Sequence, residues 1–253
     1  MSNQTKTTKG VDIVMAIDLS SSMLAKDLKP NRMEALKEVA IKFVENRPND
    51  RIGIVAYAGE AYTKTPVTSD KAIVAEAIKD IKFDNVIQDG TAIGMGLSTA
   101  VNRLKDSKAK SKVIILLTDG VNNSGFIEPE MASQIAKEFK IKVYTIGIGS
   151  NGMADFPYAI APNGSFIFKK MKVEIDEQLM KNIANNSGGK YFRATSNSKL
   201  ETIYEEINKL ETTEIEELKF YDYDEKFRPF LWIAIVLLVI EIALRNTIFR
   251  SFI

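Results

Sequence analysis

Short stretches made almost entirely of apolar residues constrain the fold of this chain most strongly. They are rich in Val and Ile, and they lack the apolar–polar alternation of a strand with one face in water. Such runs are typical of central strands in a parallel sheet, because both faces of that sheet are covered. The runs are Val11–Asp18, Arg51–Ala58, Lys112–Asp119 and Lys142–Ile148.

The segments between these runs show the apolar spacing of helices that pack on one face. This spacing predicts helices around residues 33–43, 73–81, 93–104, 131–139, 179–184 and 200–210. Strands that alternate with helices require right-handed crossovers. The sequence therefore predicts an α/β fold: a doubly wound, mostly parallel, Rossmann-like sheet with helices on both faces.

Two further strands are expected. Ala61–Val67 follows its neighbouring strand after a turn of only two residues, so we predict one antiparallel edge strand there, and Pro66 suits an edge. Lys190–Thr195 follows a Gly-Gly turn and predicts the second strand.

Composition excludes several kinds of chemistry. Lys and Arg number 34 against 33 Asp and Glu, so charge gives no argument for a nucleic-acid partner, and we expect none. The chain has no cysteine and no histidine, which removes thiolate chemistry and the usual general base. Any metal must then be held by oxygen, which favours magnesium, calcium or manganese over zinc.

Three segments bring oxygen-bearing side chains to places where strands end or helices begin. They are Asp18-Leu-Ser20-Ser-Ser22, Asp89-Gly-Thr91 and Thr118-Asp119-Gly120. Each segment alone is typical of a turn or a helix cap. Because ligands of open parallel sheets collect at the carboxyl ends of the strands, the three together predict one site.

This combination resembles the von Willebrand factor A domain and its metal-ion-dependent adhesion site (MIDAS). That family's pattern is Asp-x-Ser-x-Ser, a distant Thr and a later Asp, matched here by Asp18, Ser20, Ser22, Thr91 and Asp119. The resemblance implies that the three hydroxyls contact a cation and that the aspartates act directly or through water. Magnesium or manganese would fit, because Mg²⁺ prefers oxygen ligands and keeps waters that a partner can replace. We expect a partner's Asp or Glu to fill the open position.

A narrower resemblance joins the chain to BatA-type proteins of bacterial aerotolerance (Bat) operons. It is carried by AIDLSSSMLAKDLKPNRMEALKEVA, by DGTAIGMGLSTAVNRLKDSKAKSKVIILLTDGVNN and by KVYTIGIG and GGKYFRAT. The resemblance implies a membrane-anchored protein in a complex linked to Bat proteins and MoxR-type AAA+ ATPases in the cell envelope. Other Bat-operon proteins, or such an ATPase, are the partners it implies. It places the domain in the periplasm, on a single C-terminal span in the bacterial inner (cytoplasmic) membrane.

The C-terminal segment contains an unbroken apolar run, FLWIAIVLLVI, at Phe230–Ile240. We predict a transmembrane helix at residues 229–249, surrounded by membrane lipid, with aromatic residues near both ends as interfacial anchors. The expected organisation is a polar leader (1–9), a von Willebrand factor A domain (10–211), an acidic linker (212–228), this helix and a tail (250–253).

Other features of the sequence are compatible with different functions. Gly147–Gly152 spells GxGxxG after a strand, but the prolines that follow do not predict the helix that dinucleotide binding requires. Asp18 could instead serve as a phosphatase nucleophile, so a magnesium-dependent hydrolase or phosphatase remains the alternative to a non-enzymatic binding module. The insertion Asn151–Val173 predicts either a packed surface loop or a partner contact.

Overall fold

The computed structural model describes residues 10–83, 88–119, 121–150, 152–162, 165–173, 175–216 and 227–247. It divides into two compact units, residues 1–215 and 216–253, and each is described by itself. The predicted leader, residues 217–226 of the predicted linker and the predicted tail lie outside the described residues.

Six strands form the main sheet of the first unit, in the order β3-β2-β1-β4-β5-β8. All neighbours are parallel except β3, which pairs antiparallel with β2 at one edge. This arrangement confirms the predicted α/β fold and its single antiparallel edge strand. The strands are β1 (Asp12–Asp18), β2 (Arg51–Tyr57), β3 (Ala61–Thr68), β4 (Lys112–Thr118), β5 (Lys142–Ile148) and β8 (Tyr191–Ala194).

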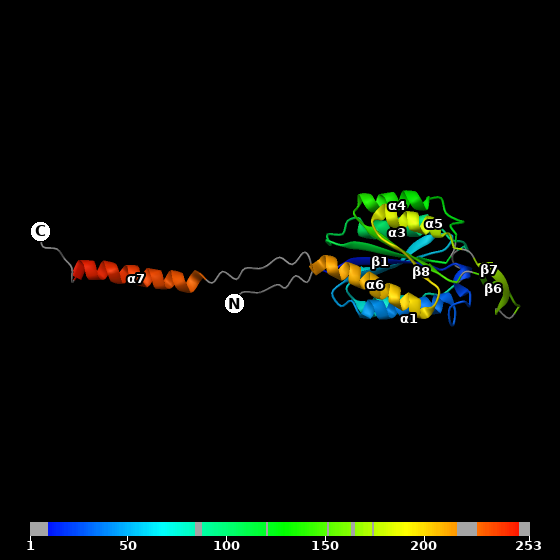
Figure 1. Ribbon diagram of the computed structural model, residues 1–253, viewed down its shortest axis with the longest axis horizontal. Coiled ribbons are helices and arrows are strands. Elements are labelled where there is room, and N and C mark those ends of the chain that lie inside the picture. The colour runs from blue at the N-terminus through cyan, green and yellow to red at the C-terminus, as the bar shows by residue number, and fades with distance from the viewer. Residues whose placement is uncertain are drawn as a thin grey trace. The chain divides into compact units, whose positions relative to one another are not determined.

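Helices cover both faces of this sheet (Figure 1). Every residue of β1 is buried, because its side chains enter two cores in alternation: Ile13, Met15 and Ile17 on one face, Val14 and Ala16 on the other. The first core includes residues of α1 (Arg32–Glu45), α2 (Lys71–Lys79) and α6 (Asn197–Glu216). The second includes residues of α3 (Ile93–Leu104), α4 (Pro129–Glu138) and α5 (Glu177–Ser187). Burial on both faces explains why the strand sequences do not alternate.

The helix α1 begins where the sequence predicts. The backbone N–H of Glu34 donates to the Asn31 side chain over 2.8 Å, which is the bond of an N-terminal cap. The capped turn places Arg32, the first residue of the helix, at the edge of the sheet where the parallel strands end. We call this edge the carboxyl edge.

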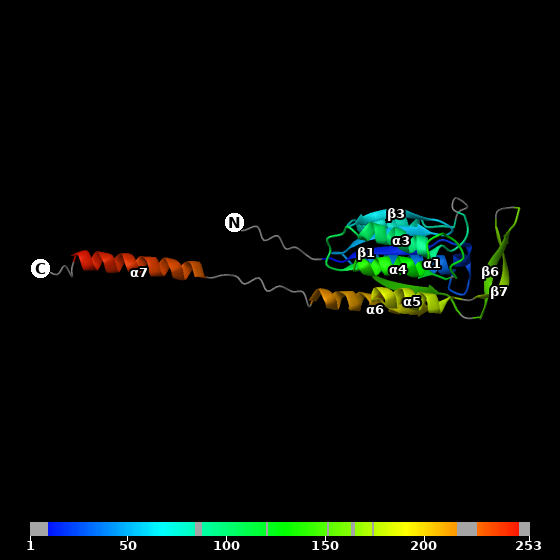
Figure 2. The same cartoon turned by 90° about the horizontal axis from the view of Figure 1, so that it is seen from above.

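The insertion after β5 forms a two-stranded antiparallel sheet of β6 (Gly152–Ile160) and β7 (Phe166–Val173). Figure 2 shows this hairpin standing across the end of the main sheet. The sequence analysis predicted no strands here. A signal was present, however, because the Asn-Gly pair at 163–164 is typical of hairpin turns.

The described part of the second unit is the helix α7 (Phe227–Thr247). Among the described residues, no helix combines the length and the apolar character that crossing a membrane requires. The prediction of a transmembrane helix at residues 229–249 is therefore wrong, as is the single inner-membrane span that it implied. The uninterrupted run Phe230–Ile240 corresponds to about 16 Å of helix at about 1.5 Å per residue. A bilayer core is about 30 Å thick.

Candidate metal site

The fold brings two aspartates together at the carboxyl edge. Asp18 is the last residue of β1, and Asp119 directly follows the last residue of β4. These strands are parallel neighbours with Ile17 opposite Leu117, so both aspartates leave the sheet at the same place. Asp18 is 0% exposed and Asp119 is 1% exposed. Two carboxylates are thus buried side by side.

The side chain of Asp18 is held by the turn that follows it and by the neighbouring strand. Its Oδ1 accepts a 2.9 Å hydrogen bond from the Ser20 N–H, and its Oδ2 accepts a 2.7 Å bond from the hydroxyl of Thr118. Both oxygens are therefore fixed in place before any ligand binds.

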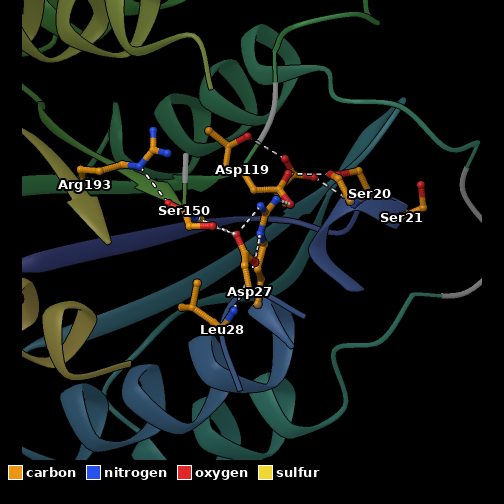
Figure 3. A network of polar contacts seen from close by, with 12 residues as sticks. Ser20, Ser21, Asp27, Leu28, Asp119, Ser150 and Arg193 are labelled. Carbon is orange, nitrogen blue, oxygen red and sulfur yellow. Dashed lines mark hydrogen bonds and ion pairs between the residues drawn. The ribbon is translucent and has the colours of Figure 1, made fainter. Parts of the chain in front are cut away.

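The two predicted serines form a chain of hydroxyls that ends on Asp119. The Oγ atoms of Ser20 and Ser22 lie 2.7 Å apart, and Ser22 donates to Oδ1 of Asp119 over 2.5 Å. Because a hydroxyl carries one proton, Ser20 donates to Ser22. Four of the five residues predicted from the sequence thus meet in one cluster, and Figure 3 shows Asp119 with the Ser20–Ser21 turn on one side.

The fifth predicted residue, Thr91, lies at the same edge but outside this hydrogen-bond chain. It is 3% exposed, and its backbone exchanges two hydrogen bonds with Asn123, in the loop after β4. Its neighbour Asp89 accepts bonds from the N–H and the hydroxyl of Ser21, at 2.9 and 2.6 Å. Ser21 therefore holds the Thr91 segment against the serine turn.

Burial and mutual repulsion control the electrostatics of the two aspartates. Burial, followed by the charge of Asp119, raises the pKa of Asp18 from 3.8 to about 7. Burial also raises the pKa of Asp119, and the charge and hydrogen bond of Arg32 offset this only in part. Two buried carboxylates that resist ionisation are in an unfavourable state that a cation between them would relieve.

Two residues that the sequence analysis did not single out complete the cluster. Arg32 is 0% exposed, and its Nη1 donates to Oδ2 of Asp119 over 2.6 Å. Its Nε and Nη2 donate to the two oxygens of Asp27, each over 2.7 Å. Burial raises the pKa of Asp27, but Arg32 outweighs this effect and holds the pKa below its usual value. Figure 3 shows Asp27 and Ser150 together near Asp119.

Gly149 explains part of the GxGxxG motif. Its φ is +134°, and a Cβ at this position would lie 2.5 Å from Nη2 of Arg32. The glycine is therefore needed for the guanidinium to reach Asp27 and Asp119, so the motif has a structural explanation without a nucleotide.

The donor set suits a hard divalent cation. If a bound cation ionises all three carboxylates, Asp18, Asp27 and Asp119 against the one guanidinium of Arg32 leave two negative charges, which one divalent ion would balance. Across the part of the chain that the structure describes, no three His, Cys, Asp or Glu side chains gather to hold a metal. The cluster agrees with this result, because its metal-facing candidates are two carboxylates and several hydroxyls. Oxygen donors of this kind match Mg²⁺ or Mn²⁺.

The family model of the von Willebrand factor type A domain matches residues 12–206, and the chain belongs to this family. Domains of this family are generally non-catalytic modules of metal-dependent protein interaction. An uncharacterized protein of Borreliella burgdorferi is 32% identical over 91% of this chain and 67% of its own length. A UPF0353 protein of Mycolicibacterium paratuberculosis is 28% identical over 77% of this chain, which spans 59% of that relative.

Three solved structures are similar to this chain over most of its length. BatB from Bacteroides thetaiotaomicron superposes with a TM-score of 0.67 at 30% identity, covering 80% of this chain and all of that one. An aerotolerance-related membrane protein from Bacteroides fragilis gives 0.66 at 30% identity, with 79% and 100% coverage. A proximal thread matrix protein of the mussel byssus, with zinc in its MIDAS motif, gives 0.61 at 26% identity, with 79% and 45% coverage. None of these proteins carries an enzyme's name.

Proposed function

We propose that the chain is a protein-binding module whose bound Mg²⁺ or Mn²⁺ accepts an acidic residue from a partner. The hydroxyls of Ser20, Ser22 and Thr91 would hold the ion, with Asp18 and Asp119 beside it. The zinc-containing MIDAS motif of the mussel neighbour supports a divalent metal in this fold. For this chain, donors made only of oxygen favour magnesium or manganese over zinc.

One observation carries the proposal: the serine turn links two buried carboxylates at the edge where ligands of such sheets bind. The Ser20 N–H donates to Asp18, and the hydroxyl chain of Ser20 and Ser22 ends on Asp119. The ion would supply a positive centre with room for one more anionic ligand. The hydrogen bonds of Asp18, Ser20, Ser22 and Asp119 would fix the position of that centre.

The partner we infer is another protein of a Bat operon or a MoxR-type AAA+ ATPase. The names of two structural neighbours, BatB and an aerotolerance-related protein, support this choice. The partner would contribute an Asp or Glu to the ion, because neutral hydroxyls leave much of its charge available to an anion.

Calorimetry of Mg²⁺ and Mn²⁺ binding tests the site. We expect the wild-type chain to bind with an affinity that falls at least tenfold in Asp18→Ala, since a principal carboxylate is lost. Asp106→Asn is the matched control, because Asp106 is exposed and its neighbour Ser107 bonds Asp12, at the other end of β1 from Asp18. Equal affinities of the wild type and Asp18→Ala would show that the metal site is wrongly assigned.

A further inference from the structure

We propose that the hairpin β6–β7 forms the second part of the docking surface beside the metal site, and that its occupant is an acidic protein segment with interspersed apolar side chains. This inference rests on the proposed function and names the chemistry of the partner.

One face of the hairpin is fastened to the domain. Along β7, Phe166 and Phe168 point to the same side, as residues two apart in a strand do. The ring of Phe166 lies 5.8 Å from that of Phe83 in an edge-on contact, and Nζ of Lys26 lies 3.7 Å from the centre of the Phe168 ring. This side is therefore the inner face.

The opposite face of β7 is buried only at its last residue, Val173, and is exposed from Ile167 to Met171. It presents Ile167, Lys169 and Met171, of which the two apolar side chains are 49% and 40% exposed. Tyr158 of β6 is 66% exposed, and Nζ of Lys169 lies 5.3 Å from the centre of its ring. A two-stranded sheet that exposes a tyrosine, an isoleucine and a methionine together is typical of an interaction surface. We call Tyr158, Ile167, Lys169 and Met171 the outer face.

The hairpin is held in place relative to the metal site. The Lys26 N–H donates to the Asp155 carbonyl of β6 over 3.1 Å. The Ser150 N–H, just before β6, donates to Asp27 over 2.7 Å, and Asp27 is paired with Arg32, which contacts Asp119. A protein that places a carboxylate on the ion would therefore meet the hairpin in a fixed position.

Charge identifies the kind of occupant. Lys169 lies on the outer face, whereas Lys170 and Lys172 alternate to the inner side, where Lys170 is opposite Asp155, the one acidic residue of the two strands. The outer face thus carries a positive charge and no negative one, and together with the neighbouring cation it would attract an acidic segment. A protein segment is favoured over an anionic membrane, because the metal site is complementary to a single carboxylate side chain.

A ligand for this surface can be identified by selection from random peptides. A random 12-residue peptide library displayed on phage is panned on the full chain in Mg²⁺, and selected peptides are synthesised for anisotropy measurements. We expect peptides enriched in Asp or Glu together with apolar residues. We also expect their affinity to fall at least tenfold in Tyr158→Ser/Ile167→Ser and at least fivefold in Lys169→Glu. Met153→Ser is the matched control at an exposed methionine paired with Lys172, away from the outer face, and should change affinity less than twofold.

The outcomes separate the two hypotheses. Calorimetry should show unchanged Mg²⁺ affinity in the hairpin variants, which also proves that they fold. If binding is lost with EDTA and in Asp18→Ala but is unchanged in the hairpin variants, the hairpin proposal is overturned while the proposed function stands. Peptides that ignore Mg²⁺ would instead contradict the proposed function. Three results would each overturn the acidic-segment proposal. The first is that no acidic peptides are selected. The other two are hairpin-dependent binding to phosphatidylglycerol vesicles and hairpin-dependent self-association in gel filtration.

Discussion

At the scale of single residues, Arg32 is the most unusual side chain near the site. A positive charge at the first residue of a helix is opposed by the helix dipole, and complete burial adds the cost of removing its water. The carboxylates of Asp27 and Asp119 offset both effects through three short hydrogen bonds. Arg32 therefore orients Asp119 so that one carboxylate oxygen faces Ser22.

We expect Arg32→Met to destabilise the chain by about 3–5 kcal/mol, because it leaves two carboxylates without their buried partner. Lys42→Met is the matched control. Lys42 pairs with Glu38 and Glu201, but all three side chains are about half exposed, so its loss should cost less than about 1 kcal/mol. Urea unfolding of both variants measures the difference. Similar costs for the two would show that Arg32 has no special role in holding the site.

The two buried aspartates predict an unusual pH dependence in EDTA. Because the pKa of Asp18 is raised from 3.8 to about 7, the folded state binds this proton more tightly than the unfolded state. The associated stability is fully present below the unfolded pKa and is lost as the pH rises toward 7. Urea midpoints should therefore fall between about pH 4 and pH 7, and this fall should be smaller in Asp18→Asn. A midpoint that rises over this range in both proteins would contradict the prediction.

Some residues of the site can be predicted from the sequence, and others cannot. Asp18, Ser20, Ser22 and Asp119 could be predicted together, because strand ends of a parallel sheet meet at one edge and the sequence marks the strands clearly. Asp27 and Arg32 could not, since their pairing depends on how α1 packs against the turn after β5. Only an indirect signal existed: an arginine at a helix N-terminus is electrostatically unfavourable and calls for an explanation.

At the scale of elements, the hairpin shows why an insertion is hard to predict. Pro157 and Pro162 argue against a helix after Gly152, and the insertion was predicted only as a packed surface loop or a partner contact. In the structure, Pro157 lies beside a register shift of the β6–β7 ladder, where the loss of one N–H is tolerated. Each strand of an isolated two-stranded ribbon has an open edge, so prolines are compatible with it. The aromatic and β-branched residues of FIFKKMKV favour a strand, and the prolines do not exclude one.

The turn between β5 and β6 provides a matched pair of glycines. Gly149 and Gly152 have φ values of +134° and +127°, but only at Gly149 would a Cβ meet other atoms, those of Arg32. We expect Gly152→Ala to cost about 1–2 kcal/mol from backbone strain alone. Gly149→Ala should cost clearly more, and the excess should shrink when Arg32 is also replaced by Met. Urea unfolding of the wild type, Gly149→Ala, Arg32→Met and the double variant forms the cycle, with Gly152→Ala measured beside it. Equal costs at the two glycines would refute the contact.

At the scale of the whole molecule, the two hydrophobic cores hold the metal site in place. The cores on both faces of the sheet hold β1 and β4 rigidly side by side, and the site uses this rigidity to keep Asp18 and Asp119 together. The sequence predicts this layout well because it follows from the length and burial of the strands. The sequence predicted the C-terminal helix less well. An apolar run is compatible with a buried helix or with a membrane span, and the run alone does not show whether the helix is long enough to cross a bilayer.

A cation that binds only the folded chain should stabilise the whole domain. At a Mg²⁺ concentration about 100 times the Kd, linkage gives a gain of about 2.7 kcal/mol. For a domain of this size each kcal/mol corresponds to about 2–4 °C, so Tm should rise by about 5–11 °C. Because the metal competes with the proton on Asp18, the rise should be larger at pH 8 than at pH 6. Calorimetric scans with Mg²⁺ and with EDTA measure it, with Asp18→Asn as the control in which the rise should disappear. An equal rise in that variant would mean that the ion stabilises the chain from somewhere other than the carboxyl edge.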